Sequence, residues 1–225
     1  MIKIENYEVV GWEHAIRGMR NPKNSWDRSD SSFKETAQTD VMEDGDIRDC
    51  FVQFDALDIG PNDHKLMMNL ASGGPVHAKY RRMIVVYADI TAPLFWWKEF
   101  DTYKVGTVRN SCSTMHKIHV APFTIDNFSH EGCDAVPSAK AALETLIVTL
   151  EYLRVKFNET QDKKYWRALI ELLPDGYNMK ATVMLSYEVL ANMYQWRKKI
   201  PHKLDEWLIF GDWIESLPYS EIITK

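Results

Sequence analysis

Three polar side chains follow Leu173-Pro174 along a segment that is otherwise mostly apolar. Ser186 and Asn192 are nearly two helical turns apart, and Arg197 continues roughly the same flank if the segment is a helix. A hydroxyl, an amide and a guanidinium group can each hydrogen-bond a polar ligand, and each needs a partner if it is buried. The spacing alone slightly favours an arrangement in which all three side chains face water.

A second polar set lies in residues 73–116. Its polar residues include His77, Lys104, Arg109, Ser111 and Ser113. Lys104 is also consistent with a lysine at a helix end, facing the negative end of the helix dipole. The formal net charge of −5 argues against non-specific binding to a nucleic-acid backbone, but it allows a local basic pocket for one small phosphate.

Several common chemistries are excluded by missing motifs. The sequence has no GxGxxG or GxxxxGK phosphate loop, no HExxH pair and no GxSxG elbow. Among the histidines, His116 and His119 lie close together, and solvated or core histidines explain such a pair more often than a metal site does. The three cysteines have no CxxC spacing, which predicts reduced thiols, and Cys112 has no adjacent basic activator. No metal site is predicted.

Hydrophobic periodicity and turn residues predict the elements that position these side chains. Residues 64–71 are expected to form a helix that stops at Gly-Gly-Pro, and residues 82–92 a β-branched strand that stops at Pro93. A helix is expected over 94–104. Residues 21–64 are rich in Ser, Asp and Asn, which favour turns, and are expected to form a long polar excursion.

The C-terminal half is expected to be helical. The expected helices cover residues 138–157, 163–173, 178–199 and 204–217, the first with Ser138 as its N-cap. The pattern predicts one α+β domain over residues 1–225, in which a small sheet packs with long helices. No stretch approaches membrane-spanning length and no signal-peptide pattern is visible, so we expect a soluble, cytoplasmic protein.

The order of these features resembles that of the flavin-dependent thymidylate synthases. In that family a histidine precedes a strand ending in Ala-Pro, and the next helix leads into the signature RHR-x(n)-N-E-x-S-x-R-Y. Counted back from Ala92-Pro93, His77 falls at the family histidine without a gap. The resemblance covers roughly residues 62–220.

The family also has polar residues after a Leu-Pro pair, and these have counterparts in this chain. Counted from Leu173-Pro174, Asn192 falls on a family asparagine and Arg197 on a family arginine. His202 and Trp207 follow at nearly the family spacing. Ser186 stands where the family has another asparagine, and its hydroxyl can still hydrogen-bond.

The signature loop departs from the family pattern. Residues 102–104, Thr-Tyr-Lys, stand in place of RHR, so only Lys104 keeps a charge. Further along, Ser111 replaces the acid and Ser113 keeps the serine. Met115 replaces the arginine and His116 the tyrosine. Methionine cannot replace the bidentate guanidinium of arginine, so other basic residues would have to act as substitutes: Lys79, Arg81, Arg82 and Arg109.

The resemblance implies a ThyX-like fold assembled as a homotetramer, with the site shared between subunits. It implies FAD as cofactor, NADPH and methylenetetrahydrofolate as co-substrates, and conversion of dUMP to dTMP. Arg197 would face the pyrimidine of dUMP. Ser111, Ser113 and Arg109 would lie by the substrate phosphate.

The resemblance also implies a set of cofactor-binding residues. His77 would contact the flavin ring region, Lys104 an FAD or nucleotide phosphate, and Asn192 with Ser186 the space between nucleotide and flavin. The altered signature keeps a second interpretation open, a catalytically inactive ThyX-like protein that binds a nucleotide or flavin or has a structural role. A third is that the pocket binds another pyrimidine nucleotide or another flavin.

Overall fold

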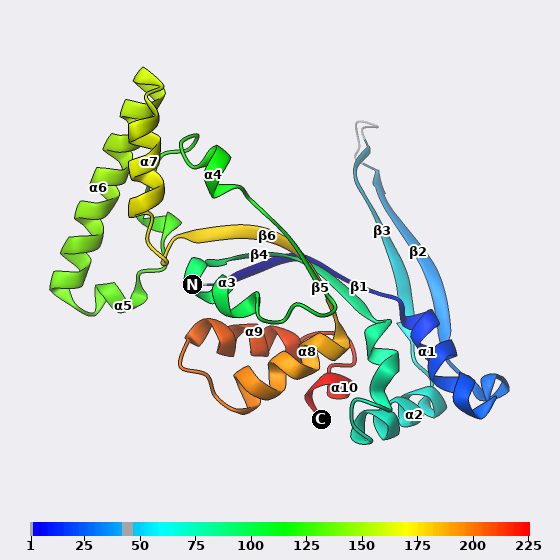
Figure 1. The fold of residues 1–225 in the computed structure, drawn as a ribbon. Coiled ribbons are helices and arrows are strands. Elements are labelled where there is room, and N and C mark those ends of the chain that lie inside the picture. Colours follow the sequence, from blue (N-terminus) through cyan, green and yellow to red (C-terminus); the bar gives the residue numbers. More distant parts are fainter. Residues whose placement is uncertain (1, 42–46) are drawn as a thin grey trace. The chain divides into compact units, whose positions relative to one another are not determined.

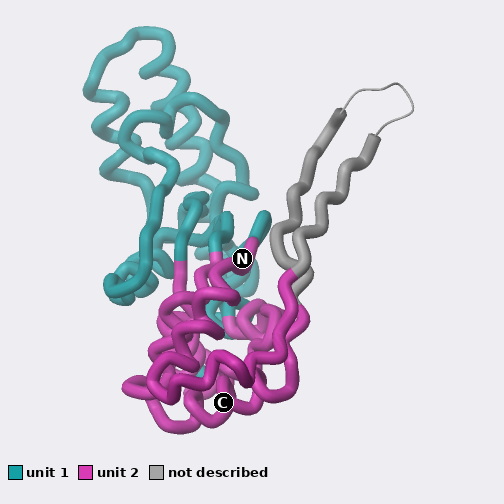
Figure 2. Tube along the Cα trace, turned by 90° about the vertical axis from the view of Figure 1, so that its right-hand side faces the viewer, with its two compact units in different colours: residues 1–7, 87–184, 201–210 teal, residues 8–86, 185–200, 211–225 magenta. Residues whose placement is uncertain are grey.

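The computed structural model describes residues 2–41 and 47–225, and the side chains of residues 2–33 and 58–225. The chain divides into two compact units, coloured separately in Figure 2. Unit 1 comprises residues 1–7, 87–184 and 201–210, and unit 2 comprises residues 8–86, 185–200 and 211–225. Each unit is therefore built from segments that are far apart in the sequence.

The larger sheet among the described residues has four strands (Figure 1). Its strands are β1 (Lys3–Val10), β4 (Val85–Pro93), β6 (Asn178–Ser186) and β5 (Thr107–Ser111), in that spatial order. Alternate residues of β4 and β6 are buried, such as Ile90 in β4 and Val183 in β6. This period of two is the signature of a strand with one face on a core.

Aromatic side chains form the core of unit 1 next to this sheet. Helix α3 (Leu94–Phe100) follows β4 directly and carries Trp96, Trp97 and Phe100, all fully buried. Trp207 and Phe210, from α9 (Asp205–Glu215), pack against Trp96 with ring centroids 4.9 and 5.6 Å away. Burial of five large rings supplies most of the apolar driving force in this region.

Two of the residues that follow the family spacing meet at one carboxylate of α3. The Nε1 of Trp207 donates to Glu99 Oε2 at 2.8 Å, and His202 Nε2 lies 3.4 Å from the same oxygen. Trp207 is completely buried, so this hydrogen bond satisfies an indole N–H that would otherwise be costly. The spacing of His202 and Trp207 thus has a structural explanation within unit 1.

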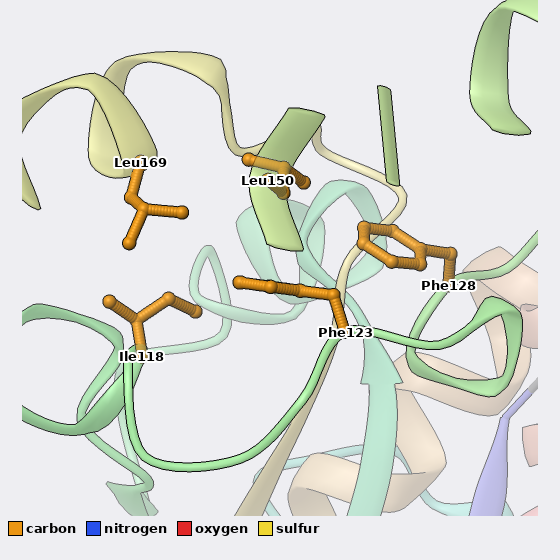
Figure 3. Close-up of a cluster of buried hydrophobic side chains, with 5 residues drawn as sticks. All are labelled: Ile118, Phe123, Phe128, Leu150 and Leu169. Atoms are coloured by element: carbon orange, nitrogen blue, oxygen red, sulfur yellow. The ribbon is translucent and has the colours of Figure 1, made fainter. Parts of the chain in front are cut away.

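A helical hairpin forms the rest of unit 1. Helix α6 (Pro137–Thr160) reverses at Gln161, whose φ of 57° is left-handed, and α7 (Lys163–Leu172) packs back on it. The short helices α4 (Thr114–Lys117) and α5 (Glu131–Asp134) precede α6. Figure 3 shows a buried cluster that joins the hairpin to the preceding chain and consists of Ile118, Phe123, Phe128, Leu150 and Leu169.

Unit 2 is built around short helices. These are α1 (Trp12–Arg20), α2 (Pro61–Ser72), η3 (Ala78–Arg82), α8 (Tyr187–Tyr194), η5 (Gln195–Lys199) and α10 (Glu221–Thr224). Helix α8 packs on η3 and α10, and α2 also packs on α10. A buried ion pair between Arg20 of α1 and Asp63 of α2, 2.6 Å long, ties the two helices together.

The excursion predicted over residues 21–64 contains regular structure. Two short turns, η1 (Asn21–Lys23) and η2 (Trp26–Arg28), are followed by strands β2 (Ser32–Val41) and β3 (Ile47–Asp58). The two strands pair antiparallel, with a register shift after Lys34. The expectation of a loop was wrong because abundant Ser, Asp and Asn favour turns, and the strand character of the neighbouring segments 32–41 and 47–58 was not recognised.

Other boundaries also differ from expectation. Residues 178–199 were expected to be one helix, but residues 178–186 form β6 and the helix starts at Tyr187. The alternation of Met179, Ala181 and Val183 is a strand period that was read as a helical one. Helix α6 begins at Pro137 after Val136, not at Ser138, which fits the preference of proline for the first helical position.

The remaining helix and strand predictions are confirmed within a few residues. The helix expected at 64–71 is α2, and those at 163–173 and 204–217 are α7 and α9. The strand expected at 82–92 is β4. Helix α3 ends at Phe100 rather than at residue 104, so Lys104 is not a helix-end lysine. Within the described residues, none of the helices is long and apolar enough to cross a membrane.

Candidate functional site

A pocket of about 380 Å³ lies in unit 1 where α3 leads into β5. It is lined by Phe100, Asp101, Tyr103, Lys104, Thr107 and Arg109. The turn between the two elements passes through Gly106, whose φ of 78° is in the left-handed region that glycine adopts without strain. This reversal brings residues from both sides of the turn to one pocket, and the volume is in the range of small-ligand sites, about 300–1,000 Å³.

Arg109 is the best-anchored cation of the pocket. Its guanidinium carbon lies 4.9 Å from the ring centroid of Trp97, and its Nη2 lies 3.0 Å from Asp101 Oδ2. Trp97 is itself held, because its Nε1 donates to the Met179 carbonyl at 2.9 Å. A cation stacked on a fixed indole is preorganised to bind an anion.

Two polar atoms among the residues of this pocket have no hydrogen-bond partner within the described part of the chain. They are Arg109 Nη1 and Thr107 Oγ1, both shielded from solvent. A buried donor without a partner costs about 1–3 kcal/mol, and such groups mark places where a ligand or water completes the network. Lys104 is exposed at the rim of the pocket and adds a second positive charge. With Asp101 counted, the pocket carries two cations and one carboxylate.

The two predicted serines lie beyond this pocket. Ser111 ends β5 and is exposed. The next residue, Cys112, donates its backbone N–H to the Lys180 carbonyl at 2.9 Å, which fixes the strand end beside β6. Ser113 is the N-cap of α4, and its Oγ accepts the backbone N–H of His116 at 3.0 Å. Each hydroxyl can still donate one hydrogen bond to a ligand.

The other predicted residues belong to unit 2. His77 precedes η3 and is exposed, with its ring close to Gly73, where an added Cβ would come within 3.0 Å of it. Ser186 is buried and is the N-cap of α8, where its Oγ accepts the Val189 N–H at 3.3 Å. Asn192 is exposed on α8. Ser186 therefore has a structural role in starting the helix.

Arg197 lies in an unusual backbone segment. Helix α8 continues directly into η5, a π-helical turn that carries Arg197 at its centre. Wide turns of this kind are rare and occur often at functional sites. Flanking side chains hold the turn: Tyr194 Oη donates to Glu215 Oε1 at 2.7 Å, and Lys198 pairs with Asp212. The hydrogen bond with Glu215 raises the pKa of Tyr194 to about 12, so its hydroxyl stays protonated.

The structure thus brings Lys104 and Arg109 to one pocket, but it places Ser111 and Ser113 outside that pocket's lining. Asp101 and Thr107 were not predicted as site residues, because nothing in their spacing shows that the chain reverses at Gly106. It also missed the π-helical turn, which leaves no residue-type signature. Within the part of the chain that the structure describes, no cluster of three His, Cys, Asp or Glu side chains could hold a metal ion.

The fold is that of the ThyX class. The chain is similar to thymidylate synthase X from Helicobacter pylori, solved with FAD and dUMP, at 14% identity over 99% of this chain and 95% of that one, with a TM-score of 0.63. A second structure of flavin-dependent ThyX from the same organism, also with FAD and dUMP, gives 14% identity, coverage of 99% and 96%, and a TM-score of 0.60.

The chain is also similar to PolB from Streptomyces cacaoi, a UMP/dUMP methylase solved with 5-Br UMP. The identity is 11% over 100% of this chain and 92% of that one, with a TM-score of 0.63. No protein-family model and no curated protein matches the sequence. Identities this low establish the fold alone, and they confirm the α+β, ThyX-like architecture expected from the sequence.

Proposed function

We propose that this chain binds a uracil nucleotide and a flavin and transfers a one-carbon unit to the uracil ring. The specific form of the proposal is a flavin-dependent thymidylate synthase, which makes dTMP from dUMP with methylenetetrahydrofolate, FAD and NADPH. The pocket around Arg109 carries the proposal, because it offers two cations and unpartnered polar atoms to a phosphate in a ThyX-like fold.

The residues present fit the phosphate-bearing part of such ligands. Arg109 stacks on Trp97, and its unpartnered Nη1 is a donor that a phosphate oxygen can satisfy. Lys104 adds a mobile charge at the rim. In this proposal, these two cations bind the ligand phosphates in place of the arginines that the signature loop lacks. FAD, when bound, supplies the redox chemistry, while the protein binds and orients the reactants.

The other assignments follow from the resemblance and from side-chain chemistry. Arg197 faces the uracil in this proposal, where its fixed positive charge stabilises negative charge that develops on the ring. Asn192 and His77 contact the flavin through hydrogen bonds, and Ser186 orients α8, on which Asn192 lies. Ser111 and Ser113 offer hydroxyl donors to the substrate phosphate. The family shares its site between subunits, so we also propose a homotetramer.

Turnover by an Arg197 variant tests this proposal. We expect Arg197→Ala to lower the rate of dTMP formation about 100-fold or more, because loss of one preorganised transition-state donor costs that much. Product is measured by mass spectrometry after incubation with dUMP, methylenetetrahydrofolate, FAD and NADPH. The matched control is Lys199→Ala, which removes an exposed cation from the same turn. Equal rates for native protein and Arg197→Ala would remove Arg197 from the site.

A second function is favoured by the altered signature loop. Thr102 and Tyr103 cannot replace the charges of RHR, and Arg109 is already paired with Asp101. A catalytically inactive protein that binds a nucleotide or flavin would show thermal stabilisation by dUMP or FAD without product, since a ligand that binds only the native state stabilises it. Product formation would exclude this alternative.

A further inference from the structure

Asp101 is the one acidic side chain of the Arg109 pocket, and the proposed phosphate site does not explain it. Its carboxylate is about half exposed, at 45%, and Oδ2 lies 3.0 Å from Arg109 Nη2. A carboxylate next to a phosphate subsite repels the ligand's charge unless it accepts hydrogen bonds from another part of the same ligand. The ligand should therefore carry hydroxyl or amine donors close to its phosphate.

The charges of the pocket further restrict the chemical class of its ligand. Lys104 and Arg109 provide two positive charges for a phosphate, and Asp101 is an acceptor without a proton of its own. Within the described residues, no partner other than Arg109 binds the Asp101 carboxylate, so Oδ1 is left to accept. Thr107 Oγ1, also unpartnered, can donate or accept beside it. A phosphorylated sugar with neighbouring hydroxyls matches this arrangement.

We propose that the Arg109 pocket binds a ribonucleotide 5′-phosphate, with the phosphate on Lys104 and Arg109 and the ribose hydroxyls donating to Asp101. The inference rests on the proposed nucleotide-binding function and makes Asp101 the residue that distinguishes ribose from deoxyribose. A carboxylate accepts both hydroxyls of a vicinal diol, and a 2′-deoxy sugar leaves one of these contacts unmade. A nucleotide substrate and the adenylate half of a flavin dinucleotide share this chemistry.

Matched pairs of nucleotides that differ by one oxygen test the proposal and separate the two sources. Dissociation constants are measured by calorimetry for UMP and dUMP, and for AMP and 2′-deoxy-AMP, with the full-length native protein. We expect at least one ribonucleotide to bind about tenfold more tightly than its deoxy counterpart, as for loss of one hydrogen bond to a charged group. Preference within the AMP pair indicates a site for the cofactor's adenylate half, in keeping with a thymidylate synthase that acts on dUMP. Preference within the UMP pair indicates a uracil ribonucleotide as the substrate in place of dUMP.

The variant Asp101→Asn tests whether Asp101 causes the preference for ribonucleotides over deoxyribonucleotides. It keeps the side-chain size but replaces one acceptor oxygen by a donor amide, so the ribo/deoxy ratio should fall close to one. Asp175→Asn is the matched control, because Asp175 is an exposed acid of unit 1 that pairs with Lys98 away from the pocket; its ratio should equal that of the native protein. A circular dichroism melt verifies that both variants fold.

Three results would overturn the inference. Native protein could bind ribo and deoxy forms equally, the preference could persist in Asp101→Asn, or Asp101→Asn could tighten both forms alike, which would make Asp101 only an obstacle to phosphate. Each of these leaves the proposed function standing if dUMP or FAD binds. Absence of binding by any nucleotide or flavin would overturn the proposed function as well.

Discussion

Replacement of Asp63 by alanine is expected to lower the free energy of unfolding by about 3–5 kcal/mol, the cost of breaking a buried ion pair by removing one partner. Asp63 is completely buried, and its Oδ1 accepts from Arg20 Nε at 2.6 Å. Its Oδ2 accepts from the Ser29 and Ser31 hydroxyls, each at 2.7 Å, and from the Asp30 N–H at 3.0 Å. The variant would leave the Arg20 guanidinium, which is only 4% exposed, without its counter-ion.

Urea denaturation of native and variant protein measures this loss. Asp27→Ala is the matched control, since Asp27 is an exposed acid in the adjacent η2 turn, and it should change stability by less than about 0.5 kcal/mol. A loss of unfolding free energy at Asp63 no larger than at Asp27 would contradict this account of unit 2. In the account, the Asp63 carboxylate holds residues 20–31 against α2 through its hydrogen bonds.

The same carboxylate predicts a pH dependence. Burial raises the pKa of Asp63, but hydrogen bonds from Ser29, Ser31, Arg20 and the Asp30 N–H together outweigh it and hold the pKa below its ordinary value of 3.8. A depressed folded-state pKa contributes stability above the unfolded value, and that contribution is lost as pH falls through the folded value. The stability difference between native protein and Asp63→Ala should therefore be constant near neutral pH and shrink below about pH 4.

The second large effect is expected in the aromatic core of unit 1. Trp96→Ala should cost about 3–5 kcal/mol, because the residue is completely buried and its removal leaves a cavity among large rings. Its ring centroid lies 5.0 Å from that of Trp97 and 4.9 Å from that of Trp207. Loss of Trp96 should also loosen Trp97, on which Arg109 stacks, and so weaken nucleotide binding.

Trp96→Phe is the informative companion variant. The Trp96 Nε1 is buried without a hydrogen-bond partner, so phenylalanine removes an unsatisfied donor while it keeps most of the apolar volume. We expect a cost below about 1.5 kcal/mol, much less than for alanine, from the same denaturation experiment. Similar losses of unfolding free energy for Trp96→Phe and Trp96→Ala would contradict the absence of a hydrogen bond from the Trp96 indole N–H.

The sequence predicted those parts of the fold that depend on local chemistry. Strand β4 ends at Pro93 because proline lacks the N–H that would continue the strand, and α2 stops at Gly73 because the Gly-Gly-Pro run favours helix termination. Strand β6 was mistaken for a helix because its apolar residues also satisfy a helical spacing, and the choice is made by neighbouring strands of the sheet. Pairing of β2 with β3 joins two neighbouring segments, and it was missed because the polar composition of residues 21–64 favours turns.

The candidate site was predictable in its charges but not in its geometry. Lys104 and Arg109 could be chosen from residue type and family order, yet only the reversal at Gly106 brings them to one pocket. The stacking of Arg109 on Trp97 joins a residue of β5 to a residue of α3, and no spacing in the sequence encodes this contact. Asp101 lies inside the helix expected over residues 94–104, but in the structure it is the C-cap of α3 and pairs with Arg109, which makes it a possible ligand contact.

The most direct test of the central claim is the visible absorbance spectrum of the protein after incubation with FAD and desalting. Retained flavin bands, with a near-stoichiometric ratio to protein, are the predicted result, because Arg109 and Lys104 offer a phosphate site without the RHR arginines. Loss of the bands in Arg109→Ala would assign the retention to this pocket. A native protein that remains colourless would contradict a flavin-dependent activity and leave the ThyX-like fold with a different function.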